Sequence, residues 1–292
     1  MHDVIVIGGS YAGLAAALQL VRARRRVLVI DAGTRRNRTA SHSHGFLGQD
    51  GRDPAEIAAK GRAEVLAYPT ASFVEGRAES ALRTDDGFAV TVTNGERYEA
   101  RRLVLALGVV DELPDLPGVA ERWGRSIFHC PYCHGYELDG GRIGVLATSP
   151  HSMHHALMLP DWGSVTYFTR GFEPNAEERA ALDRRGVTIE PTMVTKIEDV
   201  ATVRLADDRA LSFAGLFLMP RTRIASPIVA DLGVELEDGP TGAFIRTDAT
   251  KETSVPNVFA CGDAALAAGS VSFAVGDGAR AGTGAHRSLM FR

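Results

Sequence analysis

The apolar positions of the chain fall into short runs that alternate with helical segments. Residues 4–7 (Val-Ile-Val-Ile) are apolar throughout, which is typical of a strand covered on both faces. An apolar helix is predicted over about 14–23, and a second apolar strand over 27–30. This strand–helix–strand order predicts an α/β fold with a parallel, doubly wound sheet.

The next part of the chain changes to alternating strands. Asp53-Pro54 predicts the cap and the first residue of a helix that runs to about residue 67. Strands are predicted around 73–83 and 88–93, and Asn94-Gly95 is a strong hairpin signal. This β-meander precedes a strand at 103–107, an arrangement more like an FAD-binding domain than a simple nicotinamide dehydrogenase.

A second strand–helix–strand set follows a proline-rich hinge at 111–118. Its predicted elements are a strand at 143–146, a helix at 152–159, a strand at 165–168 and further strands over 187–219. A second hinge is predicted near 239–242 (Gly-Pro-Thr-Gly). We therefore expect two doubly wound, Rossmann-like domains. Residues 1–113 and 242–292 form the first, which is split by insertion of the second, residues 114–241.

The composition narrows the class of protein. The chain has 292 residues, of which 45% are hydrophobic and 23% charged, as in a globular protein. Its net charge of -4 gives no reason to expect nucleic acid or an anionic membrane as a partner. The 3 cysteines do not resemble a secreted disulfide framework, and the first residues lack the regions of a signal peptide. We expect a cytoplasmic location.

The first strand runs directly into Gly8-Gly9-Ser10-Tyr11-Ala12-Gly13, and the second strand ends at Asp31. Gly8 permits a tight turn, Gly13 lets helix and strand pack closely, and Ser10 is small enough for a ligand to approach. The helix N-terminus is suited to a pyrophosphate, and Asp31 to ribose hydroxyls. The pattern therefore predicts a dinucleotide site.

The C-terminal part of the chain adds a second candidate contact to that site. The apolar strand of Phe259-Ala260-Cys261-Gly262-Asp263 delivers an acid on a glycine turn, where it can bind a ribityl hydroxyl. Ser270 is a plausible N-cap of a final helix that runs towards Ser288. The positive end of this helix could stabilise negative charge on a reduced flavin ring. Cys261 has no cysteine nearby and is expected to be a small buried residue.

The corresponding loop of the second domain lacks these features. It reads Ala147-Thr148-Ser149-Pro150-His151-Ser152, without a glycine, and Pro150 removes a backbone donor. After the following strand, only Arg170 is available for a 2′-phosphate. The sequence predicts a nucleotide fold with a degraded site, so NAD(P)H binding is doubtful.

Two cysteines lie together in His129-Cys130-Pro131-Tyr132-Cys133-His134. In a chain without an export signal, this C-x-x-C spacing favours a redox pair. The thiolate is the reactive species, and a nearby imidazolium can lower its pKa. C-x-x-C-H is also the signature of c-type haem attachment, and two Cys with two His could hold zinc. Haem attachment needs export and zinc normally needs a more open spacing, so we predict no metal.

Four pieces of the chain together resemble the low-molecular-weight thioredoxin reductases: 8–13, Ala106-Leu107-Gly108, the C-x-x-C pair and 259–263. The resemblance implies bound FAD and a homodimer. By the family pattern, Cys130 is the interchange thiol facing the substrate, and Cys133 faces the flavin ring. The residues expected to form the FAD site are Gly8, Ser10, Tyr11, Ala12, Gly13, Asp31, Ala32, Arg36, Asn37, His44, Gly45, Ala78, Ala106, Gly108, Gly262, Asp263, Ser270 and Val271.

The chain departs from ordinary thioredoxin reductases at two places. These carry Asp after the second cysteine, where this chain has His134-Gly135-Tyr136-Glu137. They also carry a glycine-rich NADPH loop and a run of basic residues, and both are missing here. Cys-x-x-Cys-His-Gly-Tyr-Glu is similar to the subgroup that contains the gliotoxin-type dithiol oxidases of natural-product pathways.

The leading hypothesis is an FAD-dependent dithiol–disulfide oxidoreductase that oxidises a small-molecule dithiol and passes the electrons through FAD to oxygen. His134 has a reference pKa near ~6.5 and is the candidate to hold or release the thiol proton, with His129 as the alternative. A reductase of a thioredoxin-like disulfide protein, fed by NAD(P)H or another donor, is the first alternative. A flavin redox sensor is the second. The sequence does not identify the thiol substrate.

Overall fold

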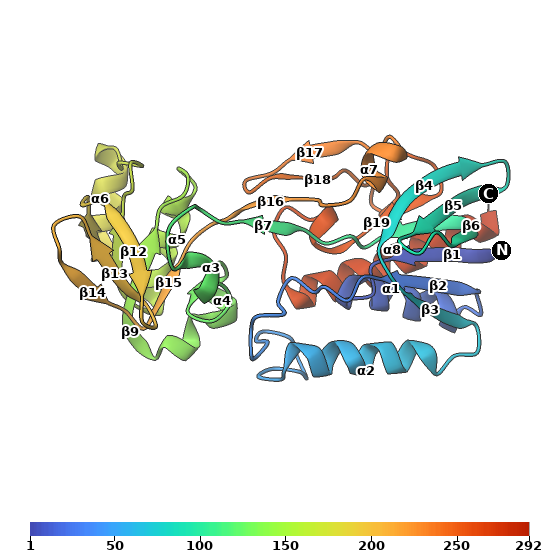
Figure 1. The fold of residues 1–292 in the computed structure, drawn as a ribbon, viewed down its shortest axis with the longest axis horizontal. Helices are drawn as coiled ribbons and strands as arrows, with labels where there is room; N and C mark the ends of the chain where they lie inside the picture. Colours follow the sequence, from blue (N-terminus) through green and yellow to red (C-terminus); the bar gives the residue numbers. More distant parts are fainter. Residues whose placement is uncertain (292) are drawn as a thin grey trace. The chain divides into compact units, whose positions relative to one another are not determined.

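The computed structural model describes residues 1–291, which form two compact units. The first unit contains Met1–Arg38, Phe46–Val110 and the chain from Thr222 onward. The second contains Thr39–Gly45 and Asp111–Arg221. Both units are α/β, and each has a doubly wound parallel sheet, which confirms the predicted fold class (Figure 1).

The first unit is built on a sheet of order β3-β2-β1-β6-β5-β4, with β19 also paired to β6. The strands are β1 (His2–Ile7), β2 (Val27–Asp31), β3 (Ala71–Glu75), β4 (Ala78–Thr84), β5 (Gly87–Val92), β6 (Arg97–Leu105) and β19 (Val258–Ala260). Strands β3, β2, β1, β6 and β19 are parallel, and β4 and β5 are antiparallel additions. Asn94-Gly95 lies in the turn between β5 and β6, as predicted.

Strand β6 changes its neighbour along one edge. Near its start, Ala100 pairs with Phe88 of the antiparallel β5, whereas Leu105 near its end pairs with Ala260 of the parallel β19. On the other edge, Leu105 pairs with Ile7 of β1. Strands β1, β6 and β19 therefore end together, and the segments that follow them meet at the carboxyl edge of the sheet.

The helices of this unit are α1 (Tyr11–Arg22), α2 (Pro54–Leu66), α7 (Ile228–Asp231) and α8 (Val271–Phe291), with a 3-10 turn η3 (Gly262–Ala265). Asp53 caps α2 as expected, because its carboxylate accepts a hydrogen bond from Ala55 N at 2.6 Å. Helices α1 and α8 pack closely through glycine. A Cβ on Gly278 would lie 2.0 Å from the Ala12 carbonyl oxygen, so no larger residue fits there.

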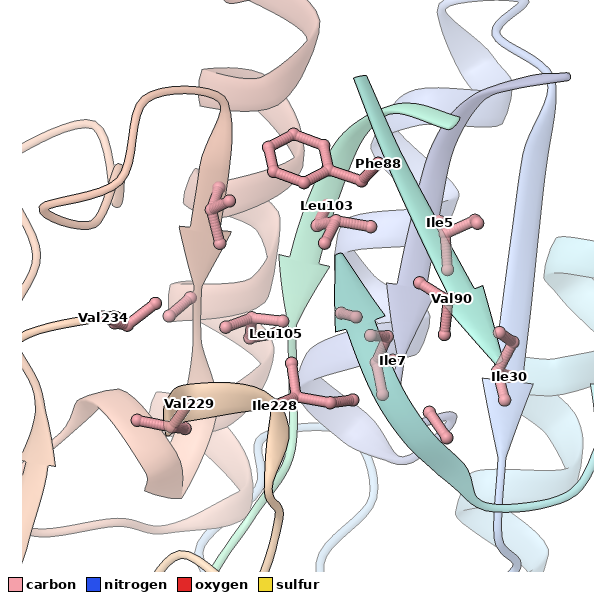
Figure 2. Packing of buried hydrophobic residues seen from close by; sticks show 14 of the residues in the cluster. Ile5, Ile7, Ile30, Phe88, Val90, Leu103, Leu105, Ile228, Val229 and Val234 are labelled. Atoms are coloured by element: carbon pink, nitrogen blue, oxygen red, sulfur yellow. The ribbon is translucent and has the colours of Figure 1, made fainter. Parts of the chain in front are cut away.

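The alternating side chains of β1 divide the core of the first unit between two faces. Val4 and Val6 belong to the cluster that includes α1 and α8. Ile5 and Ile7 point to the opposite face, where the antiparallel strands and the segment around Ile228 cover them (Figure 2). Burial on both faces explains why residues 4–7 of the strand are apolar at every position.

The second unit repeats the arrangement with a parallel sheet of order β11-β10-β9-β15-β8. Its strands are β8 (Ile127–Phe128), β9 (Gly140–Leu146), β10 (Gly163–Phe168), β11 (Thr188–Glu190) and β15 (Gly215–Phe217), with an antiparallel sheet of β12 (Val194–Glu198), β13 (Thr202–Leu205) and β14 (Ala210–Ser212). Its helices are α3 (Val119–Arg122), α4 (Pro131–His134), α5 (Ser152–Met158) and α6 (Ala176–Arg184), with 3-10 turns η1 (Tyr136–Leu138) and η2 (Leu159–Asp161).

Two further strand pairs complete the fold. Strands β7 (Val110–Glu112) and β16 (Arg221–Arg223) pair where the chain leaves and re-enters the first unit. Strands β17 (Leu236–Asp238) and β18 (Ala243–Ile245) form a hairpin. The Gly239-Pro240-Thr241-Gly242 segment, expected to be a hinge, is the turn of that hairpin. Within residues 1–291, no helix combines the length and apolar composition needed to cross a bilayer.

Candidate active site

The centre of the second unit's candidate site is a disulfide between Cys130 and Cys133, whose Cα atoms are 5.3 Å apart. Cys130 follows β8 with extended backbone and immediately precedes α4. Pro131 occupies the first helical position, where its fixed φ favours a helix start. The resulting turn, in which Cys133 N donates to Cys130 O at 3.2 Å, brings the two side chains together. Both cysteines are half-buried.

His134 lies in an apolar environment immediately after the disulfide. Its ring stacks on Phe128, with centroids 4.2 Å apart and planes inclined by 10°. Burial, with a smaller contribution from the charge of His44, lowers the pKa of His134 to about 4. The imidazole is therefore neutral at pH 7. The neutral ring is free to accept a thiol proton. The reference pKa predicts that His134 also holds a proton near neutral pH, and the lowered pKa shows that it does not.

The rest of the Cys-x-x-Cys-His-Gly-Tyr-Glu motif is contacted by Trp162, which the sequence analysis did not select, and by His44, which it assigned to the FAD site. A Cβ on Gly135 would lie 2.8 Å from ring atoms of Trp162, which explains the glycine. Tyr132, which is exposed, meets the same indole edge-on at 5.4 Å. Glu137 Oε1 lies 3.4 Å from His44 Nδ1. The only sequence signal for such packing was the glycine itself.

His129, the alternative proton carrier, lies beside a different aromatic residue. Its ring centroid is 5.9 Å from that of Trp123, with the planes inclined by 33°. The two histidines that flank the cysteines therefore have different surroundings, and only His134 stacks on a strand residue of the parallel sheet.

In the first unit, the predicted glycine turn lies at the carboxyl edge of the sheet. A Cβ on Gly8 would lie 2.1 Å from the Ala106 carbonyl oxygen, and one on Gly13 would lie 1.8 Å from the Gly8 carbonyl oxygen. Gly8 also has φ +107°, a left-handed value that favours glycine. Gly9 N donates to Asp31 Oδ1 at 3.1 Å. These contacts join the turn to the ends of β2 and β6.

The first turn of α1 fits a pyrophosphate. Ser10 is the N-cap residue, but neither it nor any other side chain in residues 1–291 caps the helix with a hydrogen bond. The first backbone N–H groups of a helix have no partner within it, so this end can bind an anion such as a phosphate. Ala12 and Gly13 lie within this turn.

Other predicted FAD-site residues interact with one another in the same unit. Arg36 Nη1 donates to Asp263 Oδ2 at 2.9 Å, which joins the loop after β2 to the turn after β19. Asn37 Nδ2 donates to the Tyr11 hydroxyl at 3.1 Å. The structure therefore links four of the predicted residues in two polar pairs.

A buried ion pair holds the turn that carries Asp263. Lys251 Nζ lies 3.0 Å from Asp277 Oδ1, and both side chains are buried. Asp277 Oδ2 accepts a hydrogen bond from Gly262 N at 3.0 Å. Burial raises the pKa of the neighbouring Cys261 thiol, which is fully buried as expected and thus inert.

The remaining predicted FAD residues lie in several places. Ala32 directly follows β2, and Gly108 has φ +63° with open space beside it. Ser270 caps α8 by accepting a hydrogen bond from Phe273 N at 3.2 Å, and Val271 is the first residue of that helix. Ala78 is buried in the core on β4. His44 and Gly45 group with the second unit rather than with the glycine turn.

The nucleotide-type loop of the second unit is occupied by its own side chains. Ser152 Oγ accepts hydrogen bonds from Thr148 N at 3.0 Å and from Ser149 N at 3.3 Å. Arg170 Nη1 donates to the Ala147 carbonyl oxygen at 2.9 Å, and burial lowers the pKa of Arg170. The backbone donors and the arginine that a phosphate would need thus already have partners.

Comparison with known proteins gives matches along nearly the whole chain. A family model described as "Pyridine nucleotide-disulphide oxidoreductase" matches residues 2–278. Thioredoxin reductase sirT of Leptosphaeria maculans is 33% identical over 97% of this chain and 93% of its own. The structure of an oxidoreductase from Agrobacterium tumefaciens is 56% identical, with a TM-score of 0.97 over 99% of both chains. The structure of HlmI is 40% identical, with a TM-score of 0.92 over 99% of this chain and 92% of its own.

Proposed function

This chain belongs to the pyridine nucleotide-disulphide oxidoreductase family and is an oxidoreductase, and we propose that it oxidises a small-molecule dithiol with FAD as its cofactor and oxygen as the acceptor. The observation that carries the proposal is the contrast between the two nucleotide-type loops. The first turn of α1 has no side-chain cap, whereas Ser152 occupies the backbone donors of the loop at 147–152. One unit is therefore prepared for a dinucleotide and the other is not.

The residues of the first unit fit FAD in their chemistry. The uncapped first turn of α1 would hold the pyrophosphate, Asp31 a ribose, and the Arg36–Asp263 pair the ribityl chain. Bound FAD would supply a two-electron acceptor for the reduced cysteine pair and a route for those electrons to oxygen. A homodimer in the cytoplasm, with neither nucleic acid nor a membrane as partner, completes the proposal.

The cysteine pair carries out the thiol chemistry. A substrate thiolate attacks Cys130 Sγ, which breaks the disulfide and leaves Cys133 as a thiolate. The substrate's second thiol, after losing its proton, then attacks the mixed disulfide. This step releases the cyclic or oxidised substrate and leaves Cys130 reduced. Two electrons and two protons have left the substrate, and neutral His134 is available to accept one of those protons.

A second candidate function is reduction of a thioredoxin-like disulfide protein with NAD(P)H or another electron donor. It is favoured by the family description, which includes a pyridine nucleotide, and by the thioredoxin reductase names of the curated relatives. With NAD(P)H as the electron donor, this function requires the nucleotide to bind at the loop 147–152, where Ser152 already accepts hydrogen bonds from the backbone N–H groups.

Anaerobic reduction distinguishes the two candidates. We expect a small dithiol to bleach the yellow colour of the purified protein. We also expect NADPH to bind at least about 100-fold more weakly than it would to a loop whose N–H groups were free. Each of the two N–H groups held by Ser152 loses a hydrogen bond to phosphate, which weakens binding by about 1.5–3 kcal/mol. Stopped-flow absorbance measures both reactions. Ser152→Ala, which frees both N–H groups, is the matched control. Rapid bleaching of the unaltered protein by NADPH would instead favour the reductase.

The role of His134 is tested by two substitutions. His134→Phe keeps an aromatic ring against Phe128 but removes both nitrogens, whereas His134→Ala removes the ring as well. If the imidazole accepts the thiol proton, both variants should slow reduction of the disulfide by a dithiol by about 100-fold. Quenched-flow alkylation of Cys130 and Cys133 measures that rate. A His134→Phe variant that keeps the unaltered rate would show that the residue contributes packing only.

A further inference from the structure

The redox motif carries two large aromatic side chains that are open to solvent. Tyr132 is 73% exposed and Tyr136 is 85% exposed, and both rank among the three most exposed Phe, Tyr and Trp residues within 1–291. A single exposed apolar residue is common on a protein surface, but large aromatic residues that gather at one place usually mark a binding surface. The thiol chemistry described above uses neither tyrosine.

The two tyrosines lie on one side of a short helical stretch. Helix α4 and the 3-10 turn η1 are joined by Gly135, whose dihedral angles are also helical (φ -71°, ψ -38°). At 3.6 residues per turn, residues four apart differ by only about 40° around the helix axis. Tyr132 and Tyr136 therefore share a face, which we call the tyrosine surface.

The same helical geometry places the cysteine pair beside this surface. Cys133 follows Tyr132 by about 100° around the axis, and His134 follows it by about 200°. His134 is on the inner side, where its ring stacks on the buried Phe128. The disulfide thus has its candidate proton acceptor on the inner side and the tyrosine surface on the outer side.

The ring of Tyr132 is held in place before any ligand arrives. It meets the indole of Trp162 with centroids 5.4 Å apart and perpendicular planes. The indole itself lies directly against the motif, because a Cβ on Gly135 would be 2.8 Å from its ring atoms. An edge-on contact leaves at least one face of the phenol ring uncovered. A side chain that is already ordered loses less entropy on binding a ligand.

We propose that Tyr132 determines the substrate specificity of the disulfide by stacking on a small dithiol whose carbon skeleton contains a flat aromatic or conjugated ring. Aromatic pairs are more favourable than the burial of their apolar area alone predicts. The contact would hold the ring beside the motif while a thiolate of the same molecule attacks Cys130 Sγ. The proposal rests on the proposed function, because it names the substrate class of the same disulfide.

The size of the tyrosine surface favours a small molecule over a protein. Tyr132 and Tyr136 can cover one ring system, whereas a stable protein interface buries about 800 Å² on each partner. A dithiol that is joined to the ring by short bonds needs no larger surface, since the mixed disulfide with Cys130 supplies the second point of attachment.

Two dithiols that differ only in the flatness of their ring test the proposal. Benzene-1,2-dimethanethiol is aromatic, and trans-cyclohexane-1,2-dimethanethiol is its saturated counterpart. Each is mixed anaerobically with the full-length protein, and the cyclic disulfide product of a single turnover is quantified after an acid quench. Dividing each rate by the rate of the same dithiol with oxidised glutathione removes the intrinsic difference in reactivity. We expect the aromatic dithiol to react about fivefold faster on this scale, the gain from one aromatic pair.

Three variants assign that preference to Tyr132. In Tyr132→Leu the ratio of the two normalised rates should fall to about one, whereas Tyr132→Phe should keep it within about twofold of the unaltered protein. Phe172→Leu is the matched control, because it makes a similar change at an exposed aromatic residue of the same unit outside the motif. It should leave the ratio unchanged. Tyr132 is mostly exposed, so its replacement should also leave Tm unchanged.

The outcomes separate this proposal from the proposed function. A ratio near one in the unaltered protein, or an unchanged ratio in Tyr132→Leu, would overturn the selection of flat rings while dithiol oxidation stands. An unchanged ratio combined with a slower reaction of reduced thioredoxin in that variant would assign the tyrosine surface to a protein partner instead. If neither dithiol is oxidised, both proposals are wrong. A failure to consume oxygen would count only against the proposed acceptor, since the single turnover needs neither oxygen nor NADPH.

Discussion

Replacing Cys133 with serine should lower dithiol-dependent turnover by at least about 1,000-fold, because a catalytic nucleophile or its redox partner has no substitute in the site. The disulfide cannot form in this variant, so the two electrons of the substrate have no acceptor in the second unit. The measurement is steady-state oxygen consumption with a small dithiol. Cys130→Ser should lose turnover to the same extent. The matched control is Cys261→Ala, which removes a buried and inert thiol and should keep at least half of the activity.

The two serine variants also distinguish the cysteines. If Cys130 faces the substrate, the Cys133→Ser protein should react with an aromatic disulfide to give a stable mixed disulfide on Cys130. Mass spectrometry detects the added group without any need for turnover. Faster labelling of Cys133 in the Cys130→Ser protein would reverse the assignment that the family pattern implies.

Replacing Lys251 with methionine should destabilise the first unit by about 3–5 kcal/mol, because Asp277 would remain buried without its cation. Lys251 Nζ and Asp277 Oδ1 are 3.0 Å apart, and both residues are less than a tenth exposed. Solvent therefore cannot screen the charge that remains on Asp277. A loss of this size lowers Tm by roughly 10 °C in a protein of this length. Because Asp277 also accepts from Gly262 N, the variant should retain less flavin after purification.

Removing both charges provides the control for that experiment. In Lys251→Met with Asp277→Asn, the amide oxygen can still accept the hydrogen bond from Gly262 N, and no charge is left unpaired. We expect this double variant to regain most of the lost Tm, since replacing a whole buried pair is often neutral or stabilising. A double variant as unstable as Lys251→Met would show that the loss comes from packing rather than from charge.

Local signals predicted most of the first unit. The glycine turn at 8–13 and the hairpin at Asn94-Gly95 depend on backbone conformations that few residues allow, and the cap at Asp53 depends on a side chain that accepts a hydrogen bond from the helix start. All three can therefore be recognised without tertiary contacts. The family resemblance drawn from four such pieces is confirmed by the family match over residues 2–278.

The same reasoning failed where a signal has more than one meaning. Gly239-Pro240-Thr241-Gly242 has the composition of a hinge and also that of a hairpin turn, and only the pairing of β17 with β18 decides between them. The strand expected at 103–107 is the end of a longer strand, β6, which begins at Arg97 and exchanges one neighbour for another. Such pairing is non-local and has no signature in a short window.

The candidate site shows a similar limit. A missing glycine predicted that the loop at 147–152 binds nucleotide poorly, but the sequence did not reveal that Ser152 itself takes up the donors. Likewise, the reference pKa of His134 ignores the stacked Phe128 and the burial that keep its ring neutral. Both facts depend on side chains that meet only after folding.

The grouping of Thr39–Gly45 with the second unit bears on how the two halves can be studied separately. A gene fragment that encodes only 111–221 would omit the segment 39–45. It would lose His44, which pairs with Glu137, and Thr39, whose side chain lies against Gly124. The shortened protein would therefore expose surfaces that are covered in the intact chain. Supplying 39–45 as a peptide, or fusing it to either end of the fragment, would be needed to reproduce the native surroundings of the cysteines.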